Sequence, residues 1–391
     1  MHSNNVIYFD NAATSWPKPE ETLQAMEHYL RHVGGNPGRS GHRHSLDAAR
    51  IVMNAREAVA ELFGIQDALN VAFTKNATEA LNLATRGLLH PGDHVITSSM
   101  EHNSVMRPLR ALEKEGLELT VIPCSSSGEL DPADLLPAIR RNTRAVYLTA
   151  ASNVTGTLMP LKEVGMLTRE KGLIFCVDAA QAGGSFPLDV TELGIDLLAF
   201  TGHKALYGPQ GTGGLYIREG LEKDIRPLMM GGTGSRSEFE EQPDFLPDKF
   251  EAGTPNTVGL AGLEAGVRFV LRRGVASIRA QEQELAGHLM NGLRTVPGLT
   301  LYGPEIPSRK IAVVSFTVEG LSPAEIAMAL DEQDMIMSRP GLHCAPSAHK
   351  TLGTFPVGTT RFSLGAFNTA EQVQTAVKAV ARLTATARRK G

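Results

Sequence analysis

The sequence has few cysteines and no long apolar run. Its 391 residues include only Cys124, Cys176 and Cys344, an odd number without CxxC spacing. This argues against a disulfide framework and against a structural zinc site. No apolar stretch approaches the ~20 residues of a membrane helix, and the first residues lack the basic and apolar regions of a signal peptide. These absences predict a soluble, cytoplasmic protein.

The chain also lacks the charge asymmetry of proteins that bind nucleic acid or anionic membranes. Its formal net charge is -4, its pI is about 6.3, and no basic run is interleaved with aromatic residues. We therefore expect neither nucleic acid nor a membrane as a partner. The remaining composition, with 42% hydrophobic and 20% charged residues, is ordinary for a globular protein.

Short apolar runs alternate with helical patterns through the first two thirds of the chain. The runs expected to be strands are residues 70–74, 94–99, 145–150, 173–179, 197–201 and 213–217. Such alternation is typical of βα units with a mainly parallel sheet flanked by helices. Apolar residues between His44 and Phe63 recur at helical spacing, and Gly64 is the expected end of that helix.

The pattern changes after a polar segment at residues 231–257. From about Leu260 the sequence predicts a long helix, a strand at 311–318, a helix from Pro323 and a strand at 360–364. We predict a large α/β domain at residues 15–260. A smaller α+β domain would comprise residues 261–391 together with the N-terminal segment 1–14.

Lys204 follows an apolar strand and a Thr-Gly-His turn, and it precedes a glycine-rich stretch that leads into another strand. A lysine at such a strand end can project into a cleft, where partial burial lowers its pKa and favours imine formation. An isolated lysine in such a loop is otherwise a solvated side chain.

Asp178 strengthens the case for a cofactor. It ends the run LIFCVD, at the edge where open α/β sheets bind ligands. A carboxylate there can keep a pyridine nitrogen protonated, which makes the ring a better electron sink. A helix cap is the alternative role for an aspartate at this place.

The segment FTKNATEALNLA supplies a possible anion site. Asn76 and Glu79 resemble a capping box at the start of a helix, so the N–H groups of Ala77 and Thr78 would face an anion. Simple capping is the alternative. His102 in EHNSV follows a strand and could stack on a flat ring, although a single histidine is more often a polar loop residue.

Eight motifs occur in order: YFDNAAT, TKNATEALN, EHNS, SNVTG, VDAAQ, FTGHKALYGPQGTGG, FEAGTPNT and RPGLHCA. Together they resemble the class V aminotransferase fold, specifically the group II (SUF-type) cysteine desulfurases and selenocysteine lyases, over nearly the whole chain. The resemblance implies a fold type I enzyme that depends on pyridoxal 5'-phosphate (PLP) and is a homodimer. It also implies a sulfur-acceptor protein or scaffold, with iron–sulfur cluster assembly as one destination of the sulfur.

The resemblance also implies roles for single residues. Lys204 would hold PLP as a Schiff base and act as the base, Asp178 would pair with the pyridine nitrogen, and His102 would stack on the ring. Gln181 would contact the 3-oxygen and Asn153 would lie beside the ring. The phosphate would be held by Ala77, Thr78, Thr201 and His203, with Thr254 contributed by the other subunit. Arg361 would bind the substrate carboxylate through its planar fork, with a surface ion pair as the alternative; Arg339 is a second candidate for substrate binding.

Cys344 decides among the reactions that such a site could support. Keeping the sulfur as a persulfide requires a thiolate that attacks the substrate sulfur. Cys344 lies in SRPGLHCAPSAHK, which is typical of a loop, and Arg339 and His343 could favour its thiolate if they lie near it. Cys176 is expected to be buried in a strand, and Cys124 to end another strand; both would be structural.

One motif departs from the group II pattern. Group II members commonly carry RxGHHCA, whereas Leu342 stands here in place of the first histidine. Three functions remain open from the sequence. The first is a cysteine desulfurase that passes sulfur to Cys344 and then to an acceptor. The second is a selenocysteine lyase or another class V aminotransferase or lyase. The third is a non-catalytic PLP-binding protein.

Overall fold

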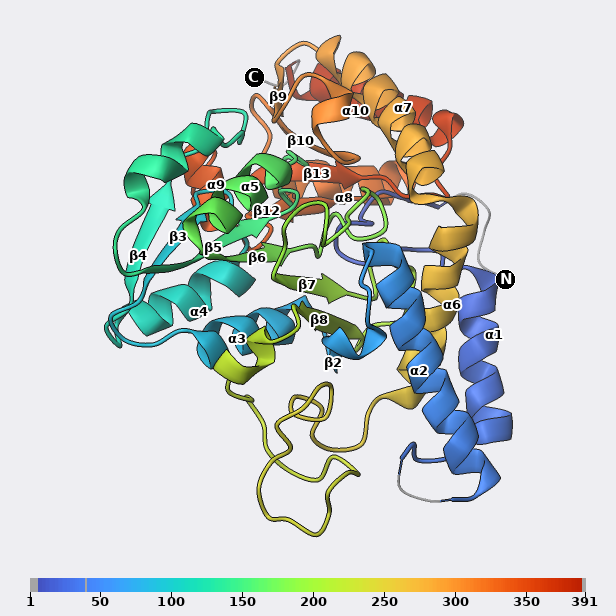
Figure 1. Ribbon diagram of the computed structural model, residues 1–391. Coiled ribbons are helices and arrows are strands. Elements are labelled where there is room, and N and C mark those ends of the chain that lie inside the picture. Colours follow the sequence, from blue (N-terminus) through green and yellow to red (C-terminus); the bar gives the residue numbers. More distant parts are fainter. Residues whose placement is uncertain (1–5, 39–40, 389–391) are drawn as a thin grey trace.

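The computed structural model describes residues 6–38 and 41–388. A central sheet of seven strands has the order β2-β8-β7-β6-β5-β3-β4 (Figure 1). The strands are β2 (Val71–Thr74), β3 (His94–Ser98), β4 (Glu118–Ile122), β5 (Thr143–Thr149), β6 (Ile174–Asp178), β7 (Leu197–Thr201) and β8 (Gly213–Ile217). Strands β4, β3, β5, β6 and β7 are parallel, and β8 is antiparallel to β7 and β2. The predicted mainly parallel sheet is confirmed.

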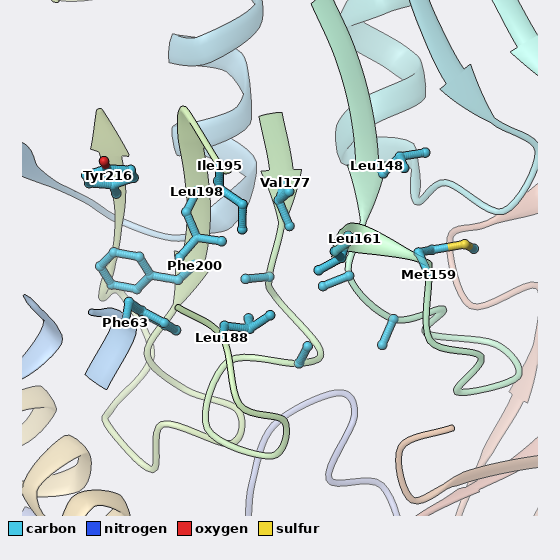
Figure 2. Packing of buried hydrophobic residues seen from close by; sticks show 14 of the residues in the cluster. Phe63, Leu148, Met159, Leu161, Val177, Leu188, Ile195, Leu198, Phe200 and Tyr216 are labelled. Atoms are coloured by element: carbon cyan, nitrogen blue, oxygen red, sulfur yellow. The ribbon is translucent and has the colours of Figure 1, made fainter. Parts of the chain in front are cut away.

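Both faces of this sheet are buried, which explains the continuous apolar runs in the sequence. Successive side chains of a strand point to opposite faces, so Leu198 and Phe200 join one core while Leu197 and Ala199 join the other. Figure 2 shows the first core, where Phe63 from the end of α2 packs beside Phe200 and Leu198.

The helices flank the sheets. They are α1 (Glu20–His28), α2 (Arg43–Phe63), α3 (Ala77–Leu88), α4 (Asn103–Glu113), α5 (Leu161–Lys171), α6 (Thr257–Arg273), α7 (Val275–Arg294), α8 (Pro323–Asp334), α9 (Pro346–Thr351) and α10 (Ala370–Arg388). Short 3-10 or π turns lie at Tyr29–Val33, Ala68–Asn70, Pro132–Ala138, Leu221–Asp224 and Pro307–Arg309. Helix α2 ends as predicted, because Gly64 follows it with a φ of 65°, a left-handed conformation that favours glycine. None of the described helices is both long and apolar enough to cross a bilayer.

A second sheet lies toward the C-terminus and has the order β12-β13-β10-β9. Its strands are β9 (Leu299–Tyr302), β10 (Val313–Val318), β12 (Arg339–Gly341) and β13 (Thr359–Ser363), all paired antiparallel. Near the N-terminus, β1 (Ile7–Tyr8) pairs in parallel with β11 (Ile336–Met337), which brings the first described residues beside the C-terminal third. The proposed domain boundary at residue 260 stays a prediction, and α6 runs across it.

Two local expectations were wrong. The long helix expected from Leu260 is two helices, because Gly274, with a φ of 82°, separates α6 from α7. Cys124 does not end a strand, because β4 stops at Ile122. Cys176 lies buried within β6, as predicted.

Candidate active site

A cavity of about 200 Å³ lies at the C-terminal ends of the parallel strands of the large sheet. Asp178 and Thr201 are the last residues of the neighbouring strands β6 and β7, so their side chains meet at one edge. The cavity is lined by Asn76, Ala77, Thr78, His102, Ser104, Thr149, Asn153, Asp178, Ala180, Gln181, Thr201, His203 and Lys204. Every residue predicted to hold the cofactor, except Thr254, is therefore in this lining.

Lys204 stands in the turn after β7 and is partly buried against the cavity. Burial lowers its pKa to about 8, and the charges of Arg361 and Arg339 add to that effect, while Asp178 opposes it. About a tenth of the amine is thus neutral at pH 7, far more than for an ordinary lysine, and the neutral form is the one a nucleophile requires. The alternative of a solvated loop lysine is wrong.

Asp178 is only 4% exposed and accepts a hydrogen bond from the Ala180 N–H at 2.9 Å. Burial raises its pKa, whereas that hydrogen bond and the charge of Lys204 lower it. A cationic ring nitrogen beside the carboxylate would favour its charged form further. The geometry therefore provides a buried counter-charge on the strand next to the lysine turn.

His102 is the N-cap of α4 and lines the cavity. Its Nδ1 accepts a hydrogen bond from the Ser104 N–H at 3.0 Å, which leaves Nε2 to carry the proton of the neutral ring. Burial, followed by the charge of Lys204, lowers the pKa of His102 to about 4, so the ring is neutral at physiological pH. A flat neutral imidazole at this place is suited to stacking.

Hydrogen-bond donors converge at the start of α3. The Asn76 side chain accepts from the Glu79 N–H at 3.0 Å, whereas Glu79 bonds the N–H of Lys75, so the expected capping box is not reciprocal. Within the described residues, no protein acceptor meets the N–H groups of Ala77 and Thr78. These free donors at a helix N-terminus fit an anionic group.

Two side chains in the same lining also lack partners. Thr201 Oγ1 and His203 Nδ1 are buried, and neither has a hydrogen-bond partner among the described residues. Because buried polar atoms are normally paired, their state indicates that a bound molecule satisfies them.

Arg361 lies in the middle of β13, with Arg339 of β12 opposite it in the register. It is 2% exposed, and its Nη2 donates to Asp10 Oδ1 at 2.9 Å while its Nη1 donates to the Asn153 carbonyl at 2.9 Å. The alternative of a surface ion pair for Arg361 is therefore wrong, because the pair is buried. Arg339 makes no ion pair with any residue that the structure describes. The two guanidinium groups make this side of the site attractive to a carboxylate.

Cys344 is exposed and lies in the loop between β12 and α9, as predicted. The loop is fastened to the cavity at two points. The Asn103 N–H donates to the Cys344 carbonyl at 2.8 Å, and the Asn153 side chain donates to the His343 carbonyl at 2.6 Å. Asn103 directly follows His102, so the thiol-bearing residue is bonded to the helix that carries the stacking candidate.

His343 cannot favour a thiolate by charge, contrary to the expectation from the sequence. Its ring is buried, with Nε2 bonded to Thr359 Oγ1 at 3.1 Å and the ring packed against His349. Burial, aided by the charge of Arg361, lowers its pKa to about 2, so it is neutral. The cation whose charge interacts with Cys344 is Arg361.

Comparison with known proteins agrees with this arrangement. The model of the family described as "Aminotransferase class-V" matches residues 7–375. The chain belongs to the class V aminotransferase family. Probable cysteine desulfurases of Pyrococcus abyssi and Methanothermobacter thermautotrophicus are 38% and 35% identical to it; the alignments cover 95% and 94% of this chain and 93% and 92% of theirs. The apo structure of the cysteine desulfurase from Thermococcus onnurineus NA1 is 36% identical with a TM-score of 0.92, covering 98% of this chain and 96% of that one.

Class V aminotransferases depend in general on PLP, and the cavity fits that group. Lys204 supplies an amine of lowered pKa, Asp178 a buried carboxylate and His102 a flat neutral ring. The free N–H groups of α3, with Thr201 and His203, supply donors for a phosphate. The fit rests on the unpaired buried atoms as well as on residue types.

The structure also shows site residues that the sequence did not point to. Ser104 lies in the lining, where its Oγ is 2.7 Å from Thr78 Oγ1 and 2.9 Å from His102 Nδ1. Lys18 Nζ donates to the His203 carbonyl at 2.8 Å. Ser104 stands within the EHNS motif and could have been found there, whereas Lys18 stands outside the quoted motifs. Asp10 lies in YFDNAAT, yet nothing in the sequence links it to Arg361.

Proposed function

We propose that this class V aminotransferase is a PLP-dependent cysteine desulfurase that converts L-cysteine to L-alanine. The sulfur would be held as a persulfide on Cys344 and passed to an acceptor thiol. The names of the relatives support this activity. A group II assignment is supported by the eight ordered motifs, although Leu342 departs from that pattern.

The observation that carries the proposal is the position of the Cys344 loop. An aminotransferase needs no thiol, whereas this site has an exposed one whose backbone is bonded to α4 at 2.8 Å. The adjacent residue is bonded to Asn153, whose own carbonyl accepts from Arg361. The thiol segment is thereby linked to the candidate carboxylate site.

Lys204, Asp178, His102, Ala77, Thr78, Thr201 and His203 would hold PLP, with Gln181 and Asn153 beside the ring. When bound, the cofactor supplies an electron sink that makes the α proton of an attached amino acid acidic. Arg361 would bind the α-carboxylate, and Arg339 would add positive charge beside it. The neutral amine of Lys204 would take the α proton at Nζ and return a proton to carbon later.

Cys344 would then attack the sulfur of the substrate as a thiolate. An S–S bond forms, the substrate Cβ–S bond breaks, and the carbon skeleton leaves as alanine after protonation. Cysteine and the enzyme thiol thus give alanine and an enzyme persulfide, with no external oxidant or reductant. A second thiol takes the outer sulfur and regenerates Cys344.

A homodimer would complete the cofactor site. Thr254 does not line the cavity around Lys204; it lines a separate cavity of about 380 Å³ together with Arg56, Phe73 and Lys75. We infer that Thr254 reaches the phosphate site of the partner subunit, as the resemblance implies. A protein or scaffold that accepts sulfur, and the cytoplasmic location, stay predictions.

The test is a substrate panel with product identification. Cysteine, selenocysteine, cystine and kynurenine are incubated with the PLP-loaded enzyme and a thiol reductant, and alanine, pyruvate, sulfide and selenide are measured. We expect alanine and sulfide in equal amounts from cysteine, lost in Cys344→Ser and retained in the control Cys124→Ser. Pyruvate in place of alanine would overturn the desulfurase assignment. Turnover of selenocysteine alone would identify a selenocysteine lyase.

A further inference from the structure

The buried ion pair between Arg361 and Asp10 joins two parts of the chain that lie far apart in sequence. Arg361 Nη2 and Asp10 Oδ1 are 2.9 Å apart, and the two side chains are 3% and 21% exposed. Asp10 follows β1 and forms an isolated parallel bridge with Ser363 at the end of β13. The carboxylate therefore reaches Arg361 from the N-terminal segment that lies along the same strand.

This pair restricts how the guanidinium group can lie. Nη2 is held by Asp10 and Nη1 by the Asn153 carbonyl, while Nε is buried and has no partner in the described part of the chain. Two fixed donors set the plane of the group, and the remaining N–H bonds stay available for a second carboxylate. A buried arginine without Asp10 would carry an uncompensated charge and would be free to turn.

The segment that carries Asp10 also contacts the lysine turn. The Ala12 N–H donates to Ser363 Oγ at 2.9 Å, and the Gln181 side chain donates to the Ala12 carbonyl at 3.1 Å. Farther along, Ser15 Oγ donates to the Lys204 carbonyl at 2.7 Å. Residues 10–15 thus bridge the arginine and the lysine that would bind the two ends of an α-amino acid.

We propose that Asp10 is a positioning residue that holds Arg361 for the α-carboxylate of the substrate. The inference rests on the proposed function only in taking an α-amino acid as the substrate. Asp10 contacts Arg361 directly. Its charge also raises the pKa of Lys204, an effect that the binding of an amine without a carboxylate reports separately. The loss of Asp10 should therefore weaken the binding of amines that carry an α-carboxylate more than the binding of amines that lack one.

The test compares L-alanine, the proposed product, with ethylamine, which is the same molecule without the carboxylate. Binding to the PLP-loaded enzyme is followed by the change in cofactor absorption. We expect Asp10→Ala to lower the affinity for L-alanine at least about tenfold, because the buried charge of Arg361 loses its partner. Asp10→Asn keeps an acceptor for Nη2 and should weaken it by roughly threefold. Ethylamine binding should change less than about twofold in both variants, since neither touches the amine site. The KM for cysteine should rise with little change in kcat, because ground-state and transition-state binding are lost together.

Asp334→Ala is the matched control. The substitution removes a carboxylate that is 12% exposed and that pairs with Arg382 instead of Arg361. Unchanged L-alanine affinity in the Asp10 variants would overturn the proposal, and so would an equal loss for ethylamine. Tighter L-alanine binding would show that Asp10 competes with the substrate, which also contradicts it. If Asp10→Ala does not fold, Asp10→Asn decides. A wild type that binds L-alanine but releases no sulfide from cysteine would refute the desulfurase activity and leave this test intact.

Discussion

The cofactor cavity and the Cys344 loop are built in opposite ways. The cavity residues stand at the ends of strands whose side chains fill two cores, and they are mostly buried. The loop places an exposed thiol on backbone with φ values of 48° at His343 and 58° at Cys344. Left-handed conformations of this kind cost about 1 kcal/mol or more for residues other than glycine. The hydrogen bonds from Asn103 and Asn153 hold that backbone in place.

The difference matches two tasks. Proton transfer at carbon needs a base and an arginine in fixed places, which strand ends provide. A thiol that receives sulfur and then delivers it to another molecule must be reachable from outside, which a loop provides. The two halves of the proposed reaction should therefore be separable by mutation.

The largest expected effect comes from removing the thiol of Cys344, which tests whether the loop and the cavity act separately. Cys344→Ser should lower sulfide release from cysteine by more than about 100-fold, because no nucleophile remains for the sulfur. Exchange of the α proton of L-alanine in heavy water depends on Lys204 and Arg361, and it should stay within about twofold of wild type. Mass spectrometry of alanine measures the exchange. An equal loss of both activities would show that the loop and the cavity do not act separately.

The second prediction concerns Lys204 and pH. Its amine attacks the cofactor aldehyde only when neutral, and burial lowers its pKa to about 8. The rate of PLP capture by the apoenzyme should therefore rise about tenfold per pH unit below about pH 8 and level off above it. The measurement is the growth of the absorption band of the lysine-bound cofactor after rapid mixing. Lys204→Ala should give no such band at any pH.

The lowered pKa of Lys204 also makes the free energy of unfolding depend on pH. Between about pH 8 and the ordinary lysine pKa of 10.5, the unfolded chain binds a proton at this position that the folded chain has lost. The contribution of Lys204 to the free energy of unfolding therefore rises with pH across that window. Below about pH 8, the folded protein bears the full cost of burying the charged amine. Capture that levels off only near pH 10 would contradict the lowered pKa.

The cavity could be predicted from the sequence because it is assembled from local patterns. Apolar runs end at Asp178 and Thr201, and parallel strands bring those ends to one edge. The helix start after Asn76 likewise has a sequence signature. Position at a strand end was thus enough to place Lys204, Asp178 and the start of α3 around one cavity.

The partners of the loop and of Arg361 could not be predicted in this way. Asp10 and Arg361 are 351 positions apart, and no periodicity links them. His343 looked like a source of charge because it adjoins Cys344, yet its ring turns toward His349 and Thr359. Side-chain direction in a loop depends on tertiary packing, which sequence neighbours do not reveal.

The smallest expected effect tests how the loop is supported. His349 in α9 is fully buried, its Nδ1 lies 2.7 Å from Thr354 Oγ1, and its ring centroid lies 5.5 Å from that of His343. His349→Ala removes this support and should cost about 2 kcal/mol of unfolding free energy. Sulfide release should fall roughly threefold to tenfold, because the thiol loses its defined position. Iodoacetamide should alkylate Cys344 faster, while exchange at L-alanine stays within about twofold. The control is His288→Ala, at an exposed position of α7. A loss of exchange as large as the loss of sulfide release would mean that His349 supports the cavity itself, and the loop would then not be an independent unit.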